Sequence, residues 1–499
     1  MDGVLYFFMA DGFKCGSTMC ATKSVPGFKE WTCHFPGMNF FLIFRGYQGN
    51  RQPTNTHTNM KRREFIQKGS AVAAATTVFS AIPGSVSAAS RIFGANDRIN
   101  VGAIGVNGMG MSDLRSFLKM DGVECLGICD VDRNVLEKQA KEATEIQGKA
   151  PRLYGDYREL LEDKDLDAVI IGTPDHWHCL PMVHACESGL DVYVEKPLAN
   201  SIEEVDLMIK AQQRYGRVVQ VGQWQRSDPH WKNAVDFVHS GKLGKIRTVK
   251  SWVYLDWKFR LPVEPDGPVP EGVDYDFWLG PAPRRPFNIN RFHFNFRWYW
   301  DYAGGLMTDW GVHLLDYALY GMNQYVPKSV MSSGGKYAWP DDARQTPDTQ
   351  YAIYEFDNIG LIWESTLGIG QGNYGRAHGV AFIGENGTLV VDRGGWEVIA
   401  EKPEGKPRME AVPLIKKTGE SGLDLHVKDF LACMKTRGTP KASVEIGGHI
   451  ARVAHLGNIA LRTGRKIFWD GEKGEIADDP EAARLTRASY RDPWKLPEV

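Results

Sequence analysis

The stretch Ile99-Asn-Val-Gly-Ala-Ile-Gly-Val-Asn-Gly-Met-Gly110 decides the fold of this 499-residue chain. Its first half is a near-continuous apolar run, which is typical of a parallel strand buried on both faces. The glycines that follow let the backbone and the start of the next helix approach a pyrophosphate. The usual spacing is G-x-G-x-x-G. Here Asn107 takes the middle position and Gly108 follows it, a variant that we accept because asparagine tolerates unusual backbone angles.

Strand and helix patterns alternate on the C-terminal side of this stretch. Further apolar runs lie at 123–129, 168–172, 191–194 and 218–221, and helical periods lie at 114–120, 135–144, 157–161, 181–188 and 202–215. This alternation predicts an α/β fold, with a Rossmann domain built on a doubly wound parallel sheet over residues 98–222.

The pattern changes after Trp224. Strand patterns lie at 246–254, 351–356, 360–366, 379–383 and 388–392, and helical ones at 229–240, 423–436 and 445–463. They predict a C-terminal α+β domain with a large, mostly antiparallel sheet over 223–465. Residues 466–499 are rich in charge and proline, and we expect them to form a tail that wraps the surface.

The N-terminal region carries an export pattern. Arg62-Arg63 followed by Phe65 is similar to a twin-arginine signal, an apolar stretch follows over 70–82, and Val86-Ser87-Ala88 suits signal peptidase. The apolar stretch is too short to span a bilayer, so we expect no stable membrane insertion. We interpret 60–89 as the signal of a periplasmic or otherwise exported protein. Residues 1–59 are then an over-extended reading frame; the alternative is a genuine extension that would defeat export.

Composition narrows the class of partner. The 59 basic and 61 acidic side chains leave a net charge of −2, and the chain has no long basic run, so nucleic acid is a poor partner. The 15 tryptophans indicate either ordinary packing or a carbohydrate site, because sugars stack on flat rings. The segment 292–302 is rich in aromatic rings and precedes the helix that we expect to carry the catalytic residues, so we expect a small saccharide substrate.

An acidic residue follows the second predicted strand. Asp130 in Cys129-Asp130-Val-Asp132 lies about 25 residues after Gly105, where a carboxylate would hold the ribose hydroxyls of a dinucleotide. A carboxylate repels a 2′-phosphate, which favours NAD over NADP as the cofactor. The neighbouring Arg133 keeps NADP as the less favoured alternative.

Two motifs follow later strands of the same predicted sheet. Thr173-Pro-Asp-His-Trp-His178 comes directly after 168–172, at the strand end that lines the cofactor crevice in such sheets. Its histidines and Cys179 match no common zinc spacing, so we predict no metal. Glu195-Lys196-Pro197 ends the next strand, where Lys196 would polarise a substrate oxygen near the nicotinamide. The alternative is a surface lysine beside a turn.

The segment Trp298–Asp316 carries the residues that we expect to move protons. On a helix that begins near Gly305, the spacing predicts that Asp309, His313 and Asp316 project from one face. A carboxylate and an imidazole together suit general-base removal of a hydroxyl proton. The alternative is a solvated helix face with a chance histidine.

These four motifs, in this order and spacing, resemble the glucose–fructose oxidoreductase/inositol dehydrogenase (Gfo/Idh/MocA) family over roughly residues 98–465. The resemblance implies that Lys196 assists proton transfer, that Asp309 and His313 line the substrate pocket, and that His313 is the acid/base. It implies that NAD(H) is held by Gly105, Asn107, Gly108, Gly110, Asp130, Thr173, Pro174, His178 and Glu195. In such proteins the sheet domain commonly forms the oligomer interface, so we expect a homodimer or homotetramer.

We therefore expect an exported NAD(H)-dependent oxidoreductase that transfers hydride from a hydroxyl of a sugar, glycoside or cyclitol. Free dinucleotides are scarce outside the cytoplasm, so its cofactor should be tightly bound and recycled in place. One alternative is an NAD-dependent glycosidase that works by transient oxidation and elimination. Another is a catalytically retired NAD-binding protein. The presence of Lys196, Asp309 and His313 favours an enzyme, and Asp309-Trp-Gly-Val-His313 looks more like the sugar dehydrogenase branch.

Overall fold

A computed structural model describes residues 98–257 and 259–499, together with two short strands, β1 (Cys20–Val25) and β2 (Phe28–Cys33), which pair antiparallel. The twin-arginine pair, the rest of 60–89 and most of 1–59 lie outside the described residues. Residues 1–86 and 87–499 are separate compact units, and the fold below is that of the second.

The first half of this unit is a six-stranded parallel sheet with the order β5-β4-β3-β6-β7-β8. Its strands are β3 (Ile99–Ile104), β4 (Val123–Cys129), β5 (Arg152–Tyr154), β6 (Ala168–Ile171), β7 (Asp191–Val194) and β8 (Val219–Val221). The predicted doubly wound Rossmann sheet is confirmed. The edge strand β5 escaped prediction because it is three residues long and largely exposed, so it has no apolar run.

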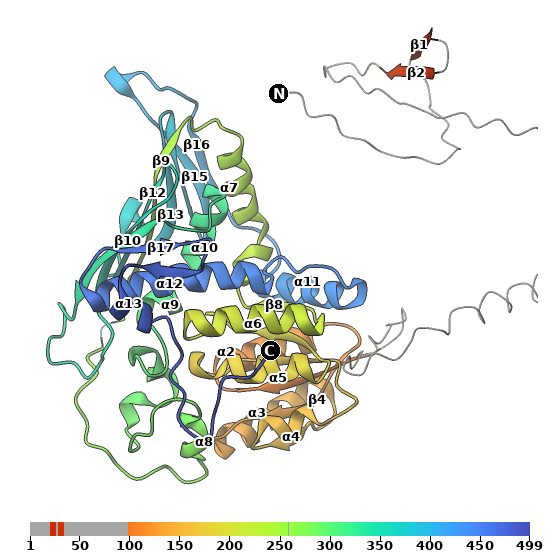
Figure 1. The fold of residues 1–499 in the computed structure, drawn as a ribbon, viewed down its shortest axis with the longest axis vertical. Coiled ribbons are helices and arrows are strands. Elements are labelled where there is room, and N and C mark those ends of the chain that lie inside the picture. Colours follow the sequence, from red (N-terminus) through yellow and green to blue (C-terminus); the bar gives the residue numbers. More distant parts are fainter. Residues whose placement is uncertain (1–19, 26–27, 34–97, 258) are drawn as a thin grey trace, which may run out of the picture. The chain divides into compact units, whose positions relative to one another are not determined.

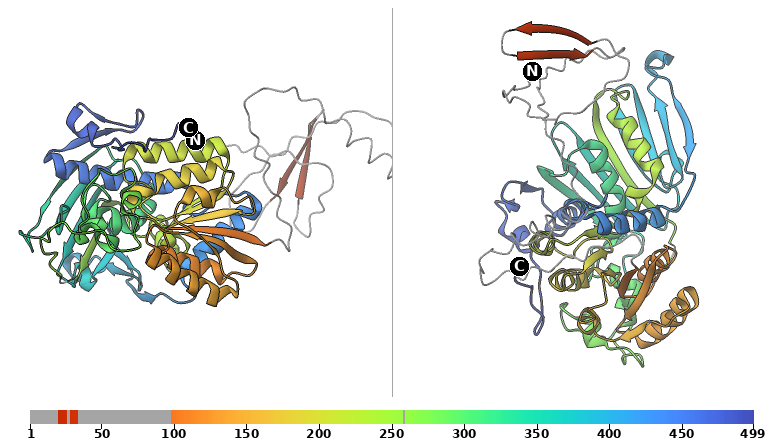
Figure 2. Two further views of the ribbon diagram at one scale, coloured as in Figure 1. Left: turned by 90° about the horizontal axis from the view of Figure 1, so that it is seen from below. Right: turned by 90° about the vertical axis from the view of Figure 1, so that its right-hand side faces the viewer.

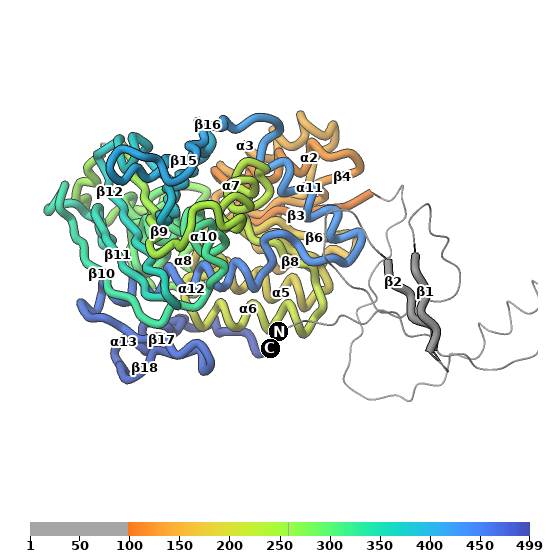
Figure 3. Tube along the Cα trace, turned by 90° about the horizontal axis from the view of Figure 1, so that it is seen from above, coloured from red at the N-terminus to blue at the C-terminus, as the bar shows by residue number. Residues whose placement is uncertain are grey.

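Helices cover both faces of this sheet (Figures 1 and 2). They are α2 (Met109–Leu118), α3 (Arg133–Gln147), α4 (Tyr157–Leu161), α5 (Cys179–Glu187) and α6 (Ile202–Tyr215). Two helices from the end of the chain complete the layers: α11 (Gly422–Thr436) packs beside α2, and α12 (Val444–Thr463) packs on α6 (Figure 3). The Rossmann core therefore includes side chains from beyond residue 222, such as Phe430 against Phe117.

The second half is built on a ten-stranded sheet with the order β16-β15-β14-β13-β9-β12-β11-β10-β17-β18. It is antiparallel except for the β9–β12 pair, which confirms the predicted large, mostly antiparallel sheet. Its strands are β9 (Ile246–Leu255), β10 (Ser329–Gly335), β11 (Thr349–Glu355), β12 (Gly360–Leu367), β13 (His378–Gly384), β14 (Gly387–Asp392), β15 (Gly395–Ala400), β16 (Val412–Lys416), β17 (Ile467–Asp470) and β18 (Glu475–Ala477).

One face of this large sheet packs against helices, and the chain then returns to the Rossmann half. The helices are α7 (Pro229–His239), α10 (Gly311–Met322) and α12, with the shorter α8 (Tyr275–Leu279) and α9 (Gly305–Asp309) nearby. Because β17 and β18 belong to the sheet, it extends past residue 465. After α13 (Pro480–Arg484) the tail runs past α8, and Trp494 packs on Trp177 and Phe277 (Figure 1).

Five cysteines lie in this unit. All five are free and buried, namely Cys125, Cys129, Cys179, Cys186 and Cys433. Burial raises the pKa of the Cys125 thiol to about 12, which leaves it protonated and unreactive. Among the described residues, no helix has both the length and the apolar character needed to cross a membrane.

Candidate active site

The glycine-rich turn brings β3, α2 and β6 into close contact. Gly105 has a φ of +76°, and a Cβ on it would lie 2.7 Å from the backbone N of Thr173. A Cβ on Gly110 would lie 1.9 Å from the carbonyl oxygen of Gly105. Gly108, at the N-cap of α2, instead faces open space, because a Cβ added there would meet no described heavy atom within 4 Å. The start of α2 is therefore accessible to an anionic group, which its free N–H groups favour.

A cavity of about 490 Å³ lies in front of this turn. Its wall includes seven predicted cofactor residues, namely Gly105, Asn107, Gly108, Asp130, Thr173, Pro174 and Glu195. Lys196 and Asp309 line it as well. The second half of the unit contributes Trp278, which no sequence motif indicated, and His293, Phe294, Phe296 and Arg297, which lie in the ring-rich segment 292–302. The cavity thus lies between the carboxyl ends of the parallel strands and the segment around residue 295.

Asp130 presents a carboxylate to this cavity. Its Oδ2 accepts the N–H of Val106 at 3.0 Å, and its Oδ1 accepts the N–H of Asp132 at 3.0 Å. Burial raises the pKa of Asp130 to about 6, which still leaves it mostly ionised at neutral pH. A negative charge at this wall suits a ribose 2′-hydroxyl and disfavours a 2′-phosphate.

His293 joins the two halves across the turn. Its Nε2 lies 2.9 Å from Oδ2 of Asp132, and its Nδ1 lies 3.2 Å from Nδ2 of Asn107. These partners assign the proton to Nε2, which donates to Asp132 while Nδ1 accepts from Asn107. The asparagine at the middle position of the glycine motif therefore has a role that glycine could not fill. It anchors the segment that covers the cavity.

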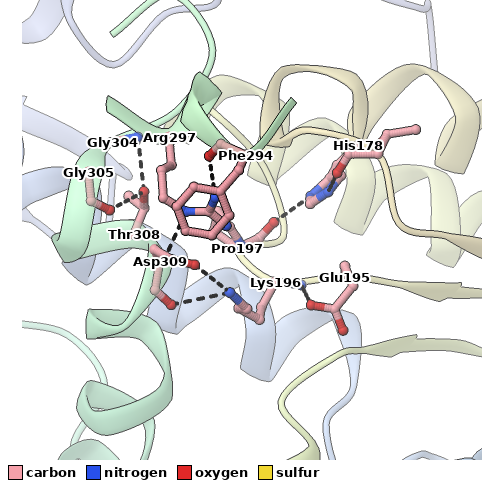
Figure 4. Close-up of polar contacts among 11 residues, drawn as sticks. His178, Glu195, Lys196, Pro197, Phe294, Arg297, Gly304, Gly305, Thr308 and Asp309 are labelled. Atoms are coloured by element: carbon pink, nitrogen blue, oxygen red, sulfur yellow. Dashed lines mark hydrogen bonds and ion pairs between the residues drawn. The ribbon is translucent and has the colours of Figure 1, made fainter. Parts of the chain in front are cut away.

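An ion-pair cluster lies where β7 meets the end of α9 (Figure 4). Lys196 Nζ lies 2.8 Å from Oδ1 of Asp309, and Nε of Arg297 lies 3.2 Å from Oδ2 of the same carboxylate. Burial opposes the charge on Lys196, but Asp309 and Glu195 outweigh it and raise the pKa of this lysine. Burial also opposes the charge on Asp309, yet Lys196 and Arg297 hold its pKa below the usual range. Both side chains are charged at neutral pH.

Two further carboxyl groups line the cavity beside this cluster. Burial raises the pKa of Glu195 to about 7 and that of Asp175 to about 8, so both carry a proton part or most of the time at neutral pH. Oε1 of Glu195 and Oγ1 of Thr173 are buried and have no hydrogen-bond partner among the described residues. Such groups are costly unless a ligand or water satisfies them. Asp175 lies inside a motif that the sequence singled out, but nothing in its spacing marked it.

Two predicted cofactor residues do not line the cavity. His178 is buried, with Nδ1 2.7 Å from the carbonyl oxygen of Pro197 and Nε2 2.9 Å from that of Thr173 (Figure 4). It therefore ties the loop after β6 to the loop after β7, and both of those loops do line the cavity. Gly110 allows α2 to approach Gly105, as described above. His178 and Gly110 therefore position the segments that line the cavity without lining it themselves.

The predicted single helix carrying Asp309, His313 and Asp316 is wrong. Two helices, α9 and α10, meet at Trp310, and Asp309 ends the first. Asp316 is 1% exposed and pairs with Arg226 at 2.6 Å, so it does not share the face of Asp309. A buried carboxylate needs a partner, and a nearby arginine overrides helical spacing.

His313 lies beside the ion-pair cluster rather than in the wall of the cavity. It is 6% exposed, its ring lies 6.1 Å from that of Trp224 and 6.4 Å from that of Trp310, and its Nδ1 has no partner among the described residues. Burial, and then the charges of Lys196 and Arg393, lower the pKa of His313 well below 6.5. The imidazole is therefore neutral at pH 7 and able to accept a proton. Lys196 beside it can stabilise negative charge on an oxygen.

The described residues contain no group of three or more His, Cys, Asp and Glu side chains arranged to hold a metal ion.

Comparisons with known proteins identify both halves. Residues 99–223 match the family described as "Oxidoreductase family, NAD-binding Rossmann fold", and residues 230–343 and 408–496 match "Oxidoreductase family, C-terminal alpha/beta domain". The two descriptions belong to one family and together cover more than half of the chain.

Individual relatives are more distant. An uncharacterized oxidoreductase of Rhizobium meliloti is 32% identical over 189 residues, 37% of this chain and 54% of that protein. An alpha-N-acetylgalactosaminidase of Shewanella oneidensis is 33% identical over 172 residues, 31% of this chain and 38% of that protein. The chain thus spans about half or less of the length of each of these curated relatives. The aldose-aldose oxidoreductase of Caulobacter crescentus shares the fold, with a TM-score of 0.55 at 18% identity over 74% of this chain and 99% of that one.

Proposed function

Because the chain belongs to the Gfo/Idh/MocA oxidoreductase family, whose N-terminal domain binds NAD, we propose that it oxidises or reduces a hydroxyl-bearing carbon of a sugar, glycoside or cyclitol. The observation that carries this proposal is the charged Lys196–Asp309 pair at the cavity wall, with the neutral His313 beside it. That set suits removal of a hydroxyl proton, which hydride chemistry at an alcohol requires.

The residues of the cavity fit NAD. The start of α2 at Gly108 suits the pyrophosphate, Asp130 suits the ribose, and the unpartnered polar atoms of Thr173 and Glu195 suit polar groups of the cofactor. The curated relatives are matched over too little of their length to fix the substrate, so the substrate class is part of the proposal.

The site residues divide the work of the oxidation. Bound NAD⁺ supplies the hydride acceptor. The substrate carbon loses a hydride, its hydroxyl loses a proton to the neutral imidazole of His313, and a C=O bond forms. The ammonium of Lys196 stabilises negative charge on the reacting oxygen, and Asp309 keeps that ammonium charged and oriented. Reduction runs through the same steps in reverse.

The direct test compares two variants with wild type. Lys196→Met and His313→Ala should each lower turnover by about 10²–10⁴-fold, because each removes a proton-transfer or charge-stabilising group. Mass spectrometry should find NAD still bound to both. The exposed Lys210→Met on α6 is the matched control and should leave turnover unchanged. Losses below about tenfold in both site variants would contradict the assignment.

A second candidate is redox-neutral glycoside cleavage. The similarity to an alpha-N-acetylgalactosaminidase supports it, because transient oxidation and elimination would need the same proton acceptor. The two candidates differ in product: a glycosidase releases an aglycone with no net change in reduced nicotinamide, whereas a dehydrogenase leaves an oxidised sugar.

We also propose export by the twin-arginine route, on the evidence of Arg62-Arg63 and the apolar stretch after it. Replacing both arginines with lysine should retain the protein in the cytoplasm, and periplasmic protein from that double variant would contradict export. An exported enzyme must carry its cofactor with it, so NAD(H) should co-purify and be recycled in place. Either a second sugar returns the hydride, or one substrate is oxidised and re-reduced in a single cycle.

We further propose a homodimer or homotetramer formed through the large sheet. The face of β10 and β11 away from the helices exposes apolar side chains, with Met331 45%, Tyr351 44% and Ile353 45% exposed. Contiguous apolar patches of this kind favour association. Light scattering should give a multiple of the chain mass, and Ile353→Lys should reduce it.

A further inference from the structure

A guanidinium with free hydrogen-bond donors, that of Arg393, acts electrostatically on His313, as Lys196 does. Arg393 follows β14, and its Cζ lies 4.3 Å from the ring centre of Trp310 and 4.9 Å from that of Trp224. Its Nε donates to Oε1 of Gln225 at 3.0 Å. Within 98–257 and 259–499, neither terminal nitrogen of Arg393 has an acceptor at hydrogen-bonding distance. The stacking and the Nε bond fix the plane of the group and leave its outer edge free.

No carboxylate neutralises Arg393 among the described residues. The two that act on it electrostatically are Asp309 and Asp228. Asp309 is already paired with Lys196 and Arg297, and Asp228 is paired with Lys417 at 2.6 Å.

These contacts leave an excess of positive charge. Four cations, those of Lys196, Arg297, Arg393 and Lys417, share the two ionised carboxylates of Asp309 and Asp228. Glu195, which also acts on Lys196, is ionised only part of the time at neutral pH. Burial lowers the pKa of Arg393 to about 10, so it remains charged at pH 7. A largely buried cation without a partner is costly, and an incoming anion would remove that cost.

The neighbours of Arg393 also lack polar partners. Nδ1 of His313 and Nε2 of His378 are buried without a hydrogen bond among the described residues. The ring of His378 lies 5.1 Å from that of Trp310. Burial lowers the pKa of both imidazoles and keeps them neutral. For His378, the charge of Arg393 is the next largest cause. Unused polar nitrogens and flat indole faces therefore surround the guanidinium, which is the combination that a sugar ring bearing a charged group would satisfy.

We propose that the saccharide substrate carries a carboxylate and that Arg393 binds it through its two terminal nitrogens, while Trp224 and Trp310 contact the sugar ring. The planar guanidinium matches a carboxylate with two parallel hydrogen bonds, which a lysine cannot reproduce. This inference rests on the proposed function, because His313 borders both the ion-pair cluster and Arg393. It narrows the substrate class from saccharides in general to uronic acids and their glycosides.

The experiment compares matched sugars on the holoenzyme. Methyl glycosides of glucose, galactose and mannose are each paired with the corresponding uronide. Turnover is followed by the absorbance of bound reduced nicotinamide, and binding by calorimetry. Wild type should favour at least one uronide over its neutral partner by about tenfold or more in kcat/KM, as expected for charge-assisted hydrogen bonds.

Variants then assign that preference to Arg393. Arg393→Gln removes a charge that lowers the pKa of His313, so it should affect every substrate, but its loss in kcat/KM for the uronide should exceed its loss for the neutral sugar by about tenfold or more. For Arg393→Lys, kcat/KM for the uronide should fall between the values of wild type and Arg393→Gln, because lysine keeps the charge but cannot form the two parallel hydrogen bonds. Arg408→Gln, at an exposed arginine that donates to the carbonyl of Glu385, is the matched control. Circular dichroism and NAD content confirm that each variant is folded.

The outcomes separate this inference from the proposed function. Equal losses for acidic and neutral sugars in Arg393→Gln, or a wild-type preference for neutral sugars or sugar phosphates, would overturn the carboxylate site while leaving the oxidoreductase intact. Arg393-dependent binding of a uronide without any absorbance change or product would support the carboxylate site and contradict the redox reaction. Absence of both binding and turnover across all pairs would contradict both.

Discussion

At the scale of single residues, the site depends on which groups are charged. Lys196 and Asp309 hold each other in the charged state, whereas burial keeps His313 neutral. The ion pair therefore offers a fixed positive charge for the reacting oxygen, and the imidazole offers a vacant proton site. The charged Lys196 can therefore act as the electrostatic stabiliser, and the neutral His313 can act as the base.

This division predicts the pH dependence of alcohol oxidation. A base acts when unprotonated, which requires a pH above its pKa, and the pKa of His313 lies well below 6.5. We expect kcat to stay constant as the pH falls from about 8 to about 6.5 and to decrease only well below that value. A pH–rate profile on the holoenzyme checks this. Glu195 and Asp175 line the same cavity and their pKa values are raised to about 7 and about 8, so the profile is repeated with Glu195→Gln and Asp175→Asn. An acidic limb centred at 6.5 or above that persists in both variants would show that another group is the base.

At the scale of elements, the cavity depends on how closely α2 approaches the end of β6. A Cβ added at Gly172 would lie 2.4 Å from the Cα of Gly110, so only glycines allow this crossing. The start of α2, and with it the open space at Gly108, is set by that contact. The asparagine at position 107 then links the turn to His293 from the other half.

Gly172→Ala should therefore displace α2 and weaken NAD binding. We expect a loss of about 1–3 kcal/mol in the free energy of unfolding, which is typical of overpacking at a close contact. Gly155→Ala is the matched control, because its Cβ would meet no described atom within 4 Å. Thermal denaturation and NAD content after gel filtration measure both effects. Indistinguishable melting temperatures and NAD contents in the two variants would refute the role of this crossing.

At the scale of the whole described unit, the C-terminal segment packs on the Rossmann half. The helices α11 and α12 complete the Rossmann layers, and Trp494 packs at ring-centre distances of 4.9 Å on Trp177 and 5.4 Å on Phe277. Both of those rings line the cavity. The tail therefore supports the wall of a site formed hundreds of residues earlier in the sequence.

Trp494→Ala should accelerate cofactor loss, because it removes the packing behind two cavity residues. The fraction of protein that retains NAD after prolonged dialysis should fall relative to wild type. Trp300→Ala is the control, because Trp300 stacks with Arg462 at 5.1 Å, as Trp494 does with Arg158 at 5.3 Å, but has no ring contact with a described side chain that lines the cavity. Equal retention in both variants would mean that the tail has no part in holding the cofactor.

The sequence by itself determined the features that depend on local order along the chain. Buried parallel strands are apolar throughout, so the runs at 99–104 and 123–129 predicted their strands, and the glycine turn and Asp130 were placed by their distance from those strand ends. The presence of Lys196 and Asp309 in the site also followed from motifs. The spacing of apolar residues within a short segment indicates which of them are buried, and this spacing can be read without knowing the rest of the fold.

Only the tertiary structure decided which distant groups meet. Lys196 pairs with Asp309 across 113 positions, and His293 reaches Asn107 across 186, and no spacing rule encodes either contact. Asp316 follows the helical spacing that predicted it, yet it turns to Arg226, because a buried charge is stable only beside its counter-charge. Charge pairing and burial are settled among neighbours in space, and those neighbours exist only once the chain has folded.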